Sequence, residues 1–294
     1  MKAVSAELPA GRQAEYRTVK KPNNVSYTGM CLKNGESESA SPIVYMEPIF
    51  EKAGPDADME RIAKDLARIL LRPIPEPGAV ALFDDPEFVL SHVVFRCYRI
   101  ADNEALLETV PHRVFLDLAV TYGIFLAPDA DNCGIAQITD SLMKQWNLTE
   151  EKLYELACRN SKTLLGERKT PLIELLPEEF RPGEEDPEPR KAAEGTYILT
   201  NRFGYLGSSL LFYSDLVEQT AKEQQSDLYL VMPVAHEILT VPVDSPRAGS
   251  LRSLAASFFF ECCRPEESLS SGVYRYSLET KRYSVVSEEE LPLR

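Results

Sequence analysis

The sequence predicts an α+β fold built mostly from antiparallel sheets. Apolar residues make up 44% of the 294-residue chain and charged residues 27%, which is the balance of a globular protein. Runs of β-branched and aromatic residues occur in adjacent pairs, and segments with helical periodicity separate these pairs. Neighbouring strands joined by short turns pair in antiparallel fashion, whereas a parallel sheet requires a crossover after each strand.

Two helices are the clearest elements of the first half. Apolar residues within Met59–Leu70 recur at intervals of three and four, and an acidic turn precedes them. The second helix starts at an N-cap residue, Thr149 or Asn147, carries two acids in its first turn and ends at Gly166. Strands are expected at 25–33, 41–50, 91–100 and 114–126, and a short helix at 103–110.

The second half repeats the alternation of strand pairs and helices. Its pattern predicts two strands around a polar turn within 227–244 and a terminal hairpin within 272–286, with LETK as its turn. Ser214 is expected to cap a helix at 214–226. Further strands are expected at 196–201 and 207–213, and a further helix at 245–263.

A proline- and acid-rich segment at 177–193 divides the chain. Its four prolines remove backbone donors and disfavour helix, and the acids between them repel one another. The segment is therefore expected to be a linker or a surface loop. The predicted organisation is a poorly ordered N-terminal segment (1–23), an α+β domain (24–176), this linker, a second α+β domain or second half of one domain (194–287), and an acidic tail (288–294).

The chain is acidic, with a net charge of −14 from 46 acidic and 32 basic residues. This balance disfavours nucleic acid as a partner, because binding to phosphates depends on lysine and arginine. No apolar run approaches the roughly 18 residues of a membrane helix, and the N-terminus lacks the apolar core of a secretory signal. The six cysteines show no spacing typical of a zinc site or a disulfide framework. We therefore expect a cytoplasmic protein with no membrane partner, metal or cofactor.

The first candidate site lies in Pro111–Asp129, PHRVFLDLAVTYGIFLAPD, at the start of an almost unbroken apolar run. A single strand over 114–126 would exceed the usual strand length, so a bend is expected near Asp117 or the later glycine. Arg113 and Asp117 share one face of this strand. The structural interpretation is an ion pair of Arg113 with Asp117 or another acid, beside a hydrogen-bonded His112. The functional interpretation is a catalytic or ligand-binding site.

The second candidate site is the pair His236 and Glu237, in VAHE between two predicted strands. The pair matches the start of the zinc motif H-E-x-x-H, but Thr240 occupies the position of the second histidine. A three-histidine zinc centre would require all three histidines of the chain to converge. At a sheet end, His236 is expected to hydrogen-bond a backbone group or to titrate near neutral pH. The signatures of nucleophile elbows, Walker loops and dinucleotide-binding loops are missing from the sequence.

Six segments carry a resemblance to a known family. They are SPIVYMEPIFEK, VPHRVFLDLAVTY, WNLTEEKLYELACRNS, YILTNRFGYLGSSLLFY, SDLYLVMPVAHEILTVP and GVYRYSLETKRYSVV. In this order they cover most of Val25–Val286, and they resemble an uncharacterised bacterial family, the domain of unknown function family 5688. The resemblance implies a bacterial cytoplasmic protein of the kind found in gut Firmicutes and their mobile genetic elements. It implies no activity, cofactor or catalytic residues.

Three functions are compatible with these observations. We favour a non-enzymatic interaction or regulatory protein that acts on another protein through a groove or sheet edge. The missing catalytic signatures, the acidic balance and the paired strands all favour it. The alternative is an unrecognised hydrolase with side chains from both candidate sites in one pocket, namely His112, Asp117, His236 and Glu237. A further alternative is an acidic anti-defence protein or DNA mimic, which requires a continuous acidic stripe.

Overall fold

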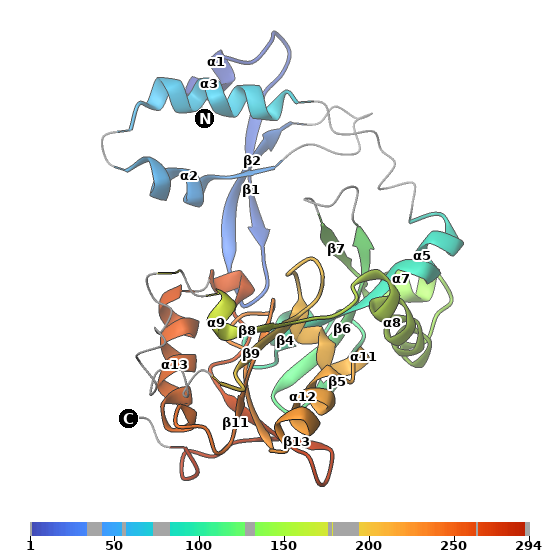
Figure 1. Ribbon diagram of the computed structural model, residues 1–294. Helices are drawn as coiled ribbons and strands as arrows, with labels where there is room; N and C mark the ends of the chain where they lie inside the picture. Colours follow the sequence, from blue (N-terminus) through green and yellow to red (C-terminus); the bar gives the residue numbers. More distant parts are fainter. Residues whose placement is uncertain are drawn as a thin grey trace. The chain divides into compact units, whose positions relative to one another are not determined.

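Helices and sheets alternate along the chain, which confirms the predicted α+β class (Figure 1). This computed structural model describes residues 2–33, 43–54, 57–72, 83–126, 133–175, 178, 194–262 and 264–291. Every pairing between strands within these ranges is antiparallel. None of the helices in them is long and apolar enough to cross a lipid bilayer.

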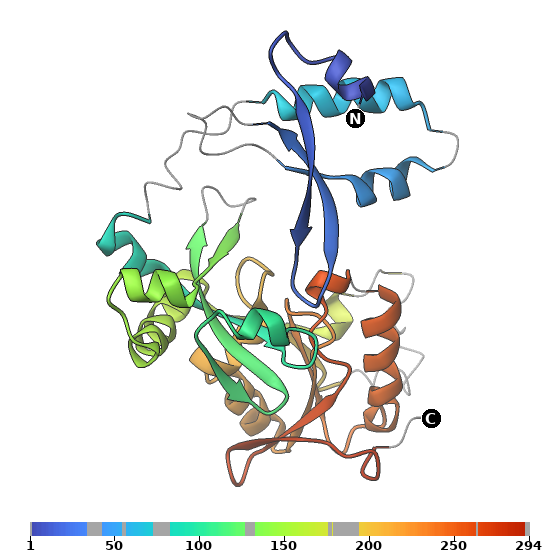
Figure 2. The same ribbon diagram turned by 180° about the vertical axis from the view of Figure 1, so that it is seen from behind.

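The chain divides into two compact units, Met1–Asp84 and Asp85–Arg294. The described part of the N-terminal unit contains one sheet, in the order β1-β2-β3, and three helices. Figure 2 shows the long hairpin of β1 and β2, in whose turn Asn23 and Asn24 adopt positive φ. Asparagine tolerates this conformation better than most residues. The elements are α1 (Lys2–Ala6), β1 (Ala14–Lys20), β2 (Ser26–Leu32), β3 (Val44–Tyr45), α2 (Met46–Ala53) and α3 (Met59–Leu70).

Helix α3 forms as predicted because its sequence supplies both a cap and an apolar face. The Asp58 carboxylate accepts hydrogen bonds from the backbone N–H groups of Glu60 and Arg61. Apolar residues of α3 pack against the sheet and against α1. The buried core of this unit comprises Val4, Leu8, Ala14, Met30, Leu32, Met46, Ala63, Leu66, Ala67 and Leu70.

The predicted strand at 41–50 is wrong for most of its length. In its described part only Val44–Tyr45 is strand, and α2 begins at the next residue. Pro48 lies in the first turn of α2, where a helix needs no N–H donor. The Glu47 carboxylate in the same turn accepts a hydrogen bond of 2.7 Å from the backbone N–H of Thr28 on β2. The helix is thus tied to the sheet at its start.

The predicted strand at 207–213 is also wrong, because this segment forms the 3₁₀ turn η2 (Gly207–Ser209) followed by α11 (Leu210–Tyr213). The hydroxyl of Ser208 donates to the carbonyl of Ala235, and the hydroxyl of Ser209 donates to the carbonyl of Leu206. Hydrogen bonds of this kind between side chain and backbone favour turns over strands. The strand pattern of the sequence therefore reflects burial in this segment.

The first sheet of the C-terminal unit is organised around the long strand β6. Strand β4 pairs with one side of β6, while β5 pairs with residues 118–121 and β7 with residues 123–126 on the other side. The single strand expected at 114–126 is therefore two strands, and the chain reverses at Leu116 and Asp117, close to the predicted bend. Val114, the first residue of the apolar run, is 68% exposed, so this run is not buried from its start. The strands are β4 (Val93–Arg99), β5 (His112–Phe115), β6 (Leu118–Leu126) and β7 (Gly134–Gln137).

The second sheet of this unit has the strand order β13-β12-β10-β11-β9-β8. Both hairpins expected in the second half are present, β10 with β11 and β12 with β13. Leu278–Lys281 form the turn of the second hairpin, as the LETK sequence predicts. The strands are β8 (Arg168–Pro171), β9 (Tyr197–Thr200), β10 (Leu228–Val231), β11 (Ile238–Pro242), β12 (Val273–Ser277) and β13 (Arg282–Val285).

Helix α8 covers the first sheet and begins and ends as the sequence predicts. The Thr149 hydroxyl accepts a hydrogen bond from the backbone N–H of Lys152, and Gly166, just beyond the helix, has φ +63°. The buried Ser161 hydroxyl accepts from the backbone N–H of Phe95 on β4. The helices of this unit include α5 (Pro86–His92), α6 (Glu104–Leu107), α7 (Asp140–Gln145), α8 (Glu150–Leu164), α9 (Leu172–Leu175), α12 (Leu216–Gln224) and α13 (Leu251–Ser257).

The two units differ from the predicted domains. Strand β8 precedes the proline-rich segment and β9 follows it, yet the two strands pair within one sheet. The boundary between units lies instead after Asp84. Residues 1–23, expected to be poorly ordered, include α1 and β1. The linker predicted at 177–193 lies outside the described residues except for Glu178, which forms no part of either strand. Composition alone does not show which strands pair across such a segment.

Candidate functional site

The residues predicted for the two candidate sites all lie in the C-terminal unit. No hydrogen bond or ion pair among the described contacts joins any two of them. Each must therefore be assessed from its own surroundings. These residues are His112, Arg113, Asp117, His236 and Glu237.

His112 begins β5, where its imidazole is half-buried. Its Nδ1 lies 3.0 Å from the carbonyl oxygen of Val110, two residues earlier in the chain. The carbonyl can only accept, so Nδ1 carries a proton in this contact. Across the ladder, His112 pairs with Thr121 of β6. The contact is that of a hydrogen-bonded histidine at a strand end.

Arg113 pairs with an acid, as the structural interpretation expects, but the acid is Glu150 rather than Asp117. Its Nε donates to the two carboxylate oxygens of Glu150 at 2.7 and 2.9 Å. The guanidinium also lies over the ring of Tyr154, 4.0 Å from the centroid. The hydroxyl of Tyr122 on β6 donates to the same Glu150 carboxylate. These contacts fix the start of α8 against the first sheet.

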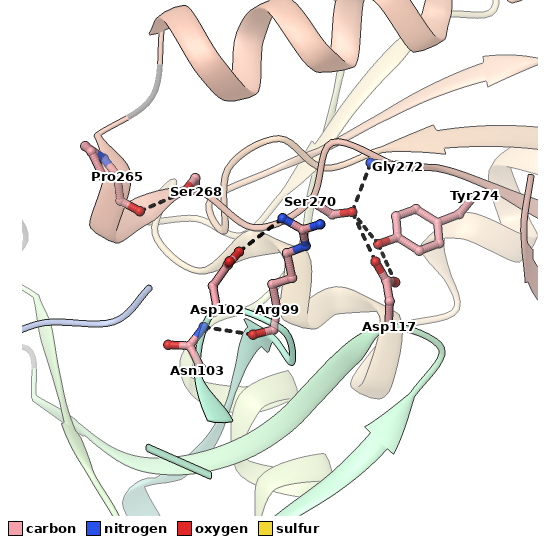
Figure 3. Close-up of polar contacts among 9 residues, drawn as sticks. All are labelled: Arg99, Asp102, Asn103, Asp117, Pro265, Ser268, Ser270, Gly272 and Tyr274. Carbon is pink, nitrogen blue, oxygen red and sulfur yellow. Dashed lines mark hydrogen bonds and ion pairs between the residues drawn. The ribbon is translucent and has the colours of Figure 1, made fainter. Parts of the chain in front are cut away.

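Asp117 reaches from the β5–β6 turn to the second sheet (Figure 3). The Tyr274 hydroxyl of β12 donates to Oδ1 of Asp117 at 2.7 Å. The Ser270 hydroxyl lies 2.7 Å from the Tyr274 hydroxyl and 3.4 Å from Oδ2 of Asp117, and it accepts from the backbone N–H of Gly272. The Ser270 and Tyr274 side chains are fully buried. The network therefore connects the β5–β6 turn to the second sheet through one half-buried carboxylate and two buried hydroxyls.

In this network the Tyr274 hydroxyl is the donor and the Asp117 carboxylate is the acceptor. Burial raises the pKa of Tyr274, and the negative charge of Asp117 raises it further, while the nearby Arg99 guanidinium opposes the rise. A tyrosine with a raised pKa keeps its proton and acts as a hydrogen-bond donor. Arg99 itself is held by Asp102 at 3.1 Å, and its carbonyl accepts from the Asn103 side chain, as Figure 3 shows.

His236 fixes the loop before η2. Its Nδ1 accepts a hydrogen bond of 3.2 Å from the backbone N–H of Leu206, which has φ +56°. The ring is stacked on Tyr205, and Nε2 lies 3.7 Å from an oxygen of Glu267. Burial lowers the pKa of His236, the Arg96 charge lowers it further, and Glu267 opposes both. An accepting Nδ1 and a lowered pKa indicate a neutral imidazole whose proton is on Nε2.

Glu237 is half-buried just before β11. Burial raises the pKa of Glu237, and the positive charge of Arg168 opposes this rise. Its neighbour His236 is bonded to the loop before η2, so the two adjacent side chains do not act on a common group. The described residues contain no group of three histidine, cysteine, aspartate or glutamate side chains that could hold a metal ion.

The N-terminal unit carries a groove of about 420 Å³, hereafter the N-terminal groove. Two of its aromatic side chains, Tyr16 on β1 and Phe50 on α2, are 46% and 45% exposed. As a helix, α2 places four of the lining residues on one face, which a strand over the same residues would divide between two faces. The lining residues are Tyr16, Thr28, Met46, Glu47, Phe50 and Glu51.

Glu47 is the most constrained polar residue of the N-terminal groove. One carboxylate oxygen accepts from the backbone N–H of Thr28, while the other is buried and has no hydrogen-bond partner in the described structure. Burial acts to raise the pKa of Glu47, but backbone hydrogen bonds from Thr28 and from the first turn of α2 outweigh it and lower the pKa. The carboxylate is therefore ionised at neutral pH. Sequence patterns missed it because the 41–50 segment was expected to be a strand.

Two tyrosines of β12 provide a matched test of the network between the sheets. Tyr274 is 1% exposed and its hydroxyl is bonded to Asp117, whereas Tyr276 is 3% exposed and its hydroxyl has no described partner. Tyr274→Phe removes the shorter of the two hydroxyl contacts to the Asp117 carboxylate, so we expect a loss of about 1–3 kcal/mol in the free energy of unfolding. Tyr276→Phe removes an unsatisfied hydroxyl and should change it by less than about 0.5 kcal/mol, or raise it. Urea unfolding of both variants measures the difference, and equal losses would contradict this account.

The lowered pKa of His236 predicts a pH dependence of stability. Because protonation is less favourable in the folded state, the stability from the neutral imidazole is fully present above the unfolded pKa of ~6.5. It is lost as the pH falls through the folded pKa. His236→Asn keeps an acceptor for the Leu206 N–H without a titrating ring, so its unfolding free energy should fall less than that of the wild type over this range. Urea unfolding at a series of pH values tests this, and parallel curves would exclude the role of His236.

A family model for the family of unknown function DUF5688 matches residues 1–278 of the chain, a range that spans both units. Comparisons with curated proteins and with solved structures gave no significant match. The family match agrees with the resemblance carried by the six sequence segments. The chain therefore belongs to the family of unknown function DUF5688.

Proposed function

We propose that this chain is a non-enzymatic interaction protein that binds a basic segment of another protein in its N-terminal groove. The observation that carries the proposal is the arrangement of two carboxylates and two exposed aromatic rings around one opening. A location in the bacterial cytoplasm is part of the proposal and follows from the family resemblance. The acidic net charge of −14 favours approach of a basic partner.

The groove chemistry suits a lysine or arginine side chain. Aromatic faces attract cations, by about 0.5–2 kcal/mol depending on desolvation, and Tyr16 and Phe50 supply two such faces. The ionised carboxylate of Glu47 supplies a negative charge beside these rings while one of its oxygens stays bonded to the Thr28 N–H. Glu51, one residue beyond Phe50, is exposed and adds a second carboxylate to the lining.

The edge of the N-terminal sheet can supply backbone contacts to the same partner. Strand β1 is the outer strand of the order β1-β2-β3, and β2 is the partner with which it pairs in the described residues. An extended peptide that adds to a sheet edge gains main-chain hydrogen bonds, and pockets for alternate side chains give specificity. Tyr16 lies on β1 and lines the groove, so an added strand would bring its side chains to the opening.

The hydrolase alternative receives less support from the contacts of its residues. It requires a nucleophile or base next to an orienting acid, about 3 Å apart, in one pocket. Asp117 is instead bonded to the buried Tyr274, and His236 accepts from a backbone N–H. The interaction proposal needs no such convergence, because the groove residues act through charge and ring faces.

Binding of short labelled peptides to the full chain tests the proposal. A lysine- and arginine-containing peptide should bind with an affinity that falls as salt is added, and an acidic peptide of equal length should not bind. Glu47→Gln removes the charge while keeping an oxygen for the Thr28 N–H, and should weaken binding about tenfold. Phe50→Ala should weaken it by a similar factor through loss of a ring face.

Two substitutions on the same unit but outside the groove serve as matched controls. Glu60 and Met59 are exposed on the first turn of α3, and neither lines the groove. Glu60→Gln and Met59→Ala should therefore leave peptide affinity within about twofold, a difference of less than ~0.5 kcal/mol. Equal binding of basic and acidic peptides, or equal losses in the groove and control variants, would contradict the proposal.

A further inference from the structure

A second opening, hereafter the C-terminal pocket, lies in the C-terminal unit between β11, α13 and the residue before β9. Its volume is about 380 Å³, within the range of small-molecule sites. Both views show α9 beside α13 at this end of the second sheet (Figure 1, Figure 2). The lining residues are Leu172, Thr196, Leu239, Val241, Arg247, Ser250, Leu251, Ser253, Leu254 and Ser257.

Thr196 is the first of two polar groups that indicate a ligand. Its side chain is only 2% exposed and lines the pocket, yet its hydroxyl oxygen has no hydrogen-bond partner among the described residues. The backbone carbonyl of Thr196 is already engaged, because it accepts from the N–H of Leu172. Buried hydroxyls are almost always hydrogen-bonded, so an unpaired hydroxyl in the lining of a pocket favours a ligand there.

Arg247 is the second polar group, and its described contacts involve its backbone. Its N–H donates to the Ser245 hydroxyl at 3.3 Å, and its carbonyl accepts from the Ser250 hydroxyl at 3.0 Å. Within the part of the chain that the structure describes, the guanidinium makes no ion pair, although acids outnumber bases by 46 to 32. The half-buried cation at the pocket is thus free to bind an anion.

The remaining walls are largely apolar. Leu239 and Val241 of β11 face the pocket from the sheet, and Leu251 and Leu254 face it from α13. Leu254 is 39% exposed, which is high for a leucine on a helix that covers a sheet. The body of a ligand in this pocket would contact hydrocarbon over most of its surface.

We propose that the C-terminal pocket binds a small organic monocarboxylate with an aliphatic or aromatic body. The carboxylate accepts from the Arg247 guanidinium and the Thr196 hydroxyl, and the apolar body packs between β11 and α13. A single cation at the pocket balances one negative charge, which favours a carboxylate over a phosphate monoester with up to two. The site lies in the other unit from the N-terminal groove and does not depend on the function proposed there.

Calorimetric titration of the full chain with octanoate tests this assignment. Octanol presents the same tail without the charge, and acetate presents the charge without the tail. Octanoate should bind at least about tenfold more tightly than either, because only octanoate uses both parts of the pocket. Equal affinity for octanol and octanoate, or no binding of octanoate, would overturn the proposal.

Two variants locate the binding. Arg247→Gln should weaken octanoate binding about tenfold and leave octanol unchanged, whereas Arg282→Gln, at an exposed position of β13, should have no effect. Thr196→Val keeps the side-chain volume and removes an unsatisfied hydroxyl, so it should weaken octanoate binding while the melting temperature stays the same or rises. A lower melting temperature for Thr196→Val would show that the hydroxyl already has a structural partner. Octanoate affinity equal to that of the wild type in both variants would place any binding elsewhere.

Discussion

The hydrogen bond from Tyr274 to Asp117 joins the two sheets of the C-terminal unit at the turn residue that precedes β6. Strand β6 is buried over nearly its whole length, so each of its backbone groups needs a partner within the protein. Strand β4 supplies those partners along one side, and β5 and β7 share the other. Since β5 pairs with residues 118–121 of β6, the turn between β5 and β6 must lie directly before residue 118. Asp117 fixes that place, because its carbonyl accepts from Ile100 beyond β4 while its carboxylate is bound by the second sheet.

Two of the polar side chains that stand out in the sequence have their hydrogen-bonding groups paired within the protein. Arg113 is held by Glu150, and His236 accepts from a backbone N–H while its ring packs on Tyr205. The side-chain atoms that lack a partner among the described residues are less conspicuous in the sequence, such as the Thr196 hydroxyl and one oxygen of Glu47. Because an unpaired buried polar atom is destabilising, such atoms are better indicators of binding than a rare residue type.

Local patterns predicted the fold where a single segment determines its own structure. The apolar spacing and cap of α3, the Thr149 cap of α8 and the hairpin with the LETK turn are all present. They failed at 41–50 and 207–213, where contacts with Thr28 and with the Ala235 carbonyl favour helical turns. Local patterns could not predict the partners of the candidate residues. Glu150 follows Arg113 by 37 residues, and Tyr274 follows Asp117 by 157. No periodicity connects positions so far apart, and the N-terminal groove exists only because α2 is a helix.

The coupling between Asp117 and Tyr274 is the most direct test of the claim that their contact joins the sheets. A double-mutant cycle of Asp117→Ala and Tyr274→Phe, measured by urea unfolding of the full chain, isolates the interaction from the effects of each substitution. We predict an interaction energy of about 1–3 kcal/mol, because the Tyr274 hydroxyl is buried and donates to an aspartate carboxylate. Losses that add to within about 0.3 kcal/mol would mean that the two side chains act independently and would contradict the account.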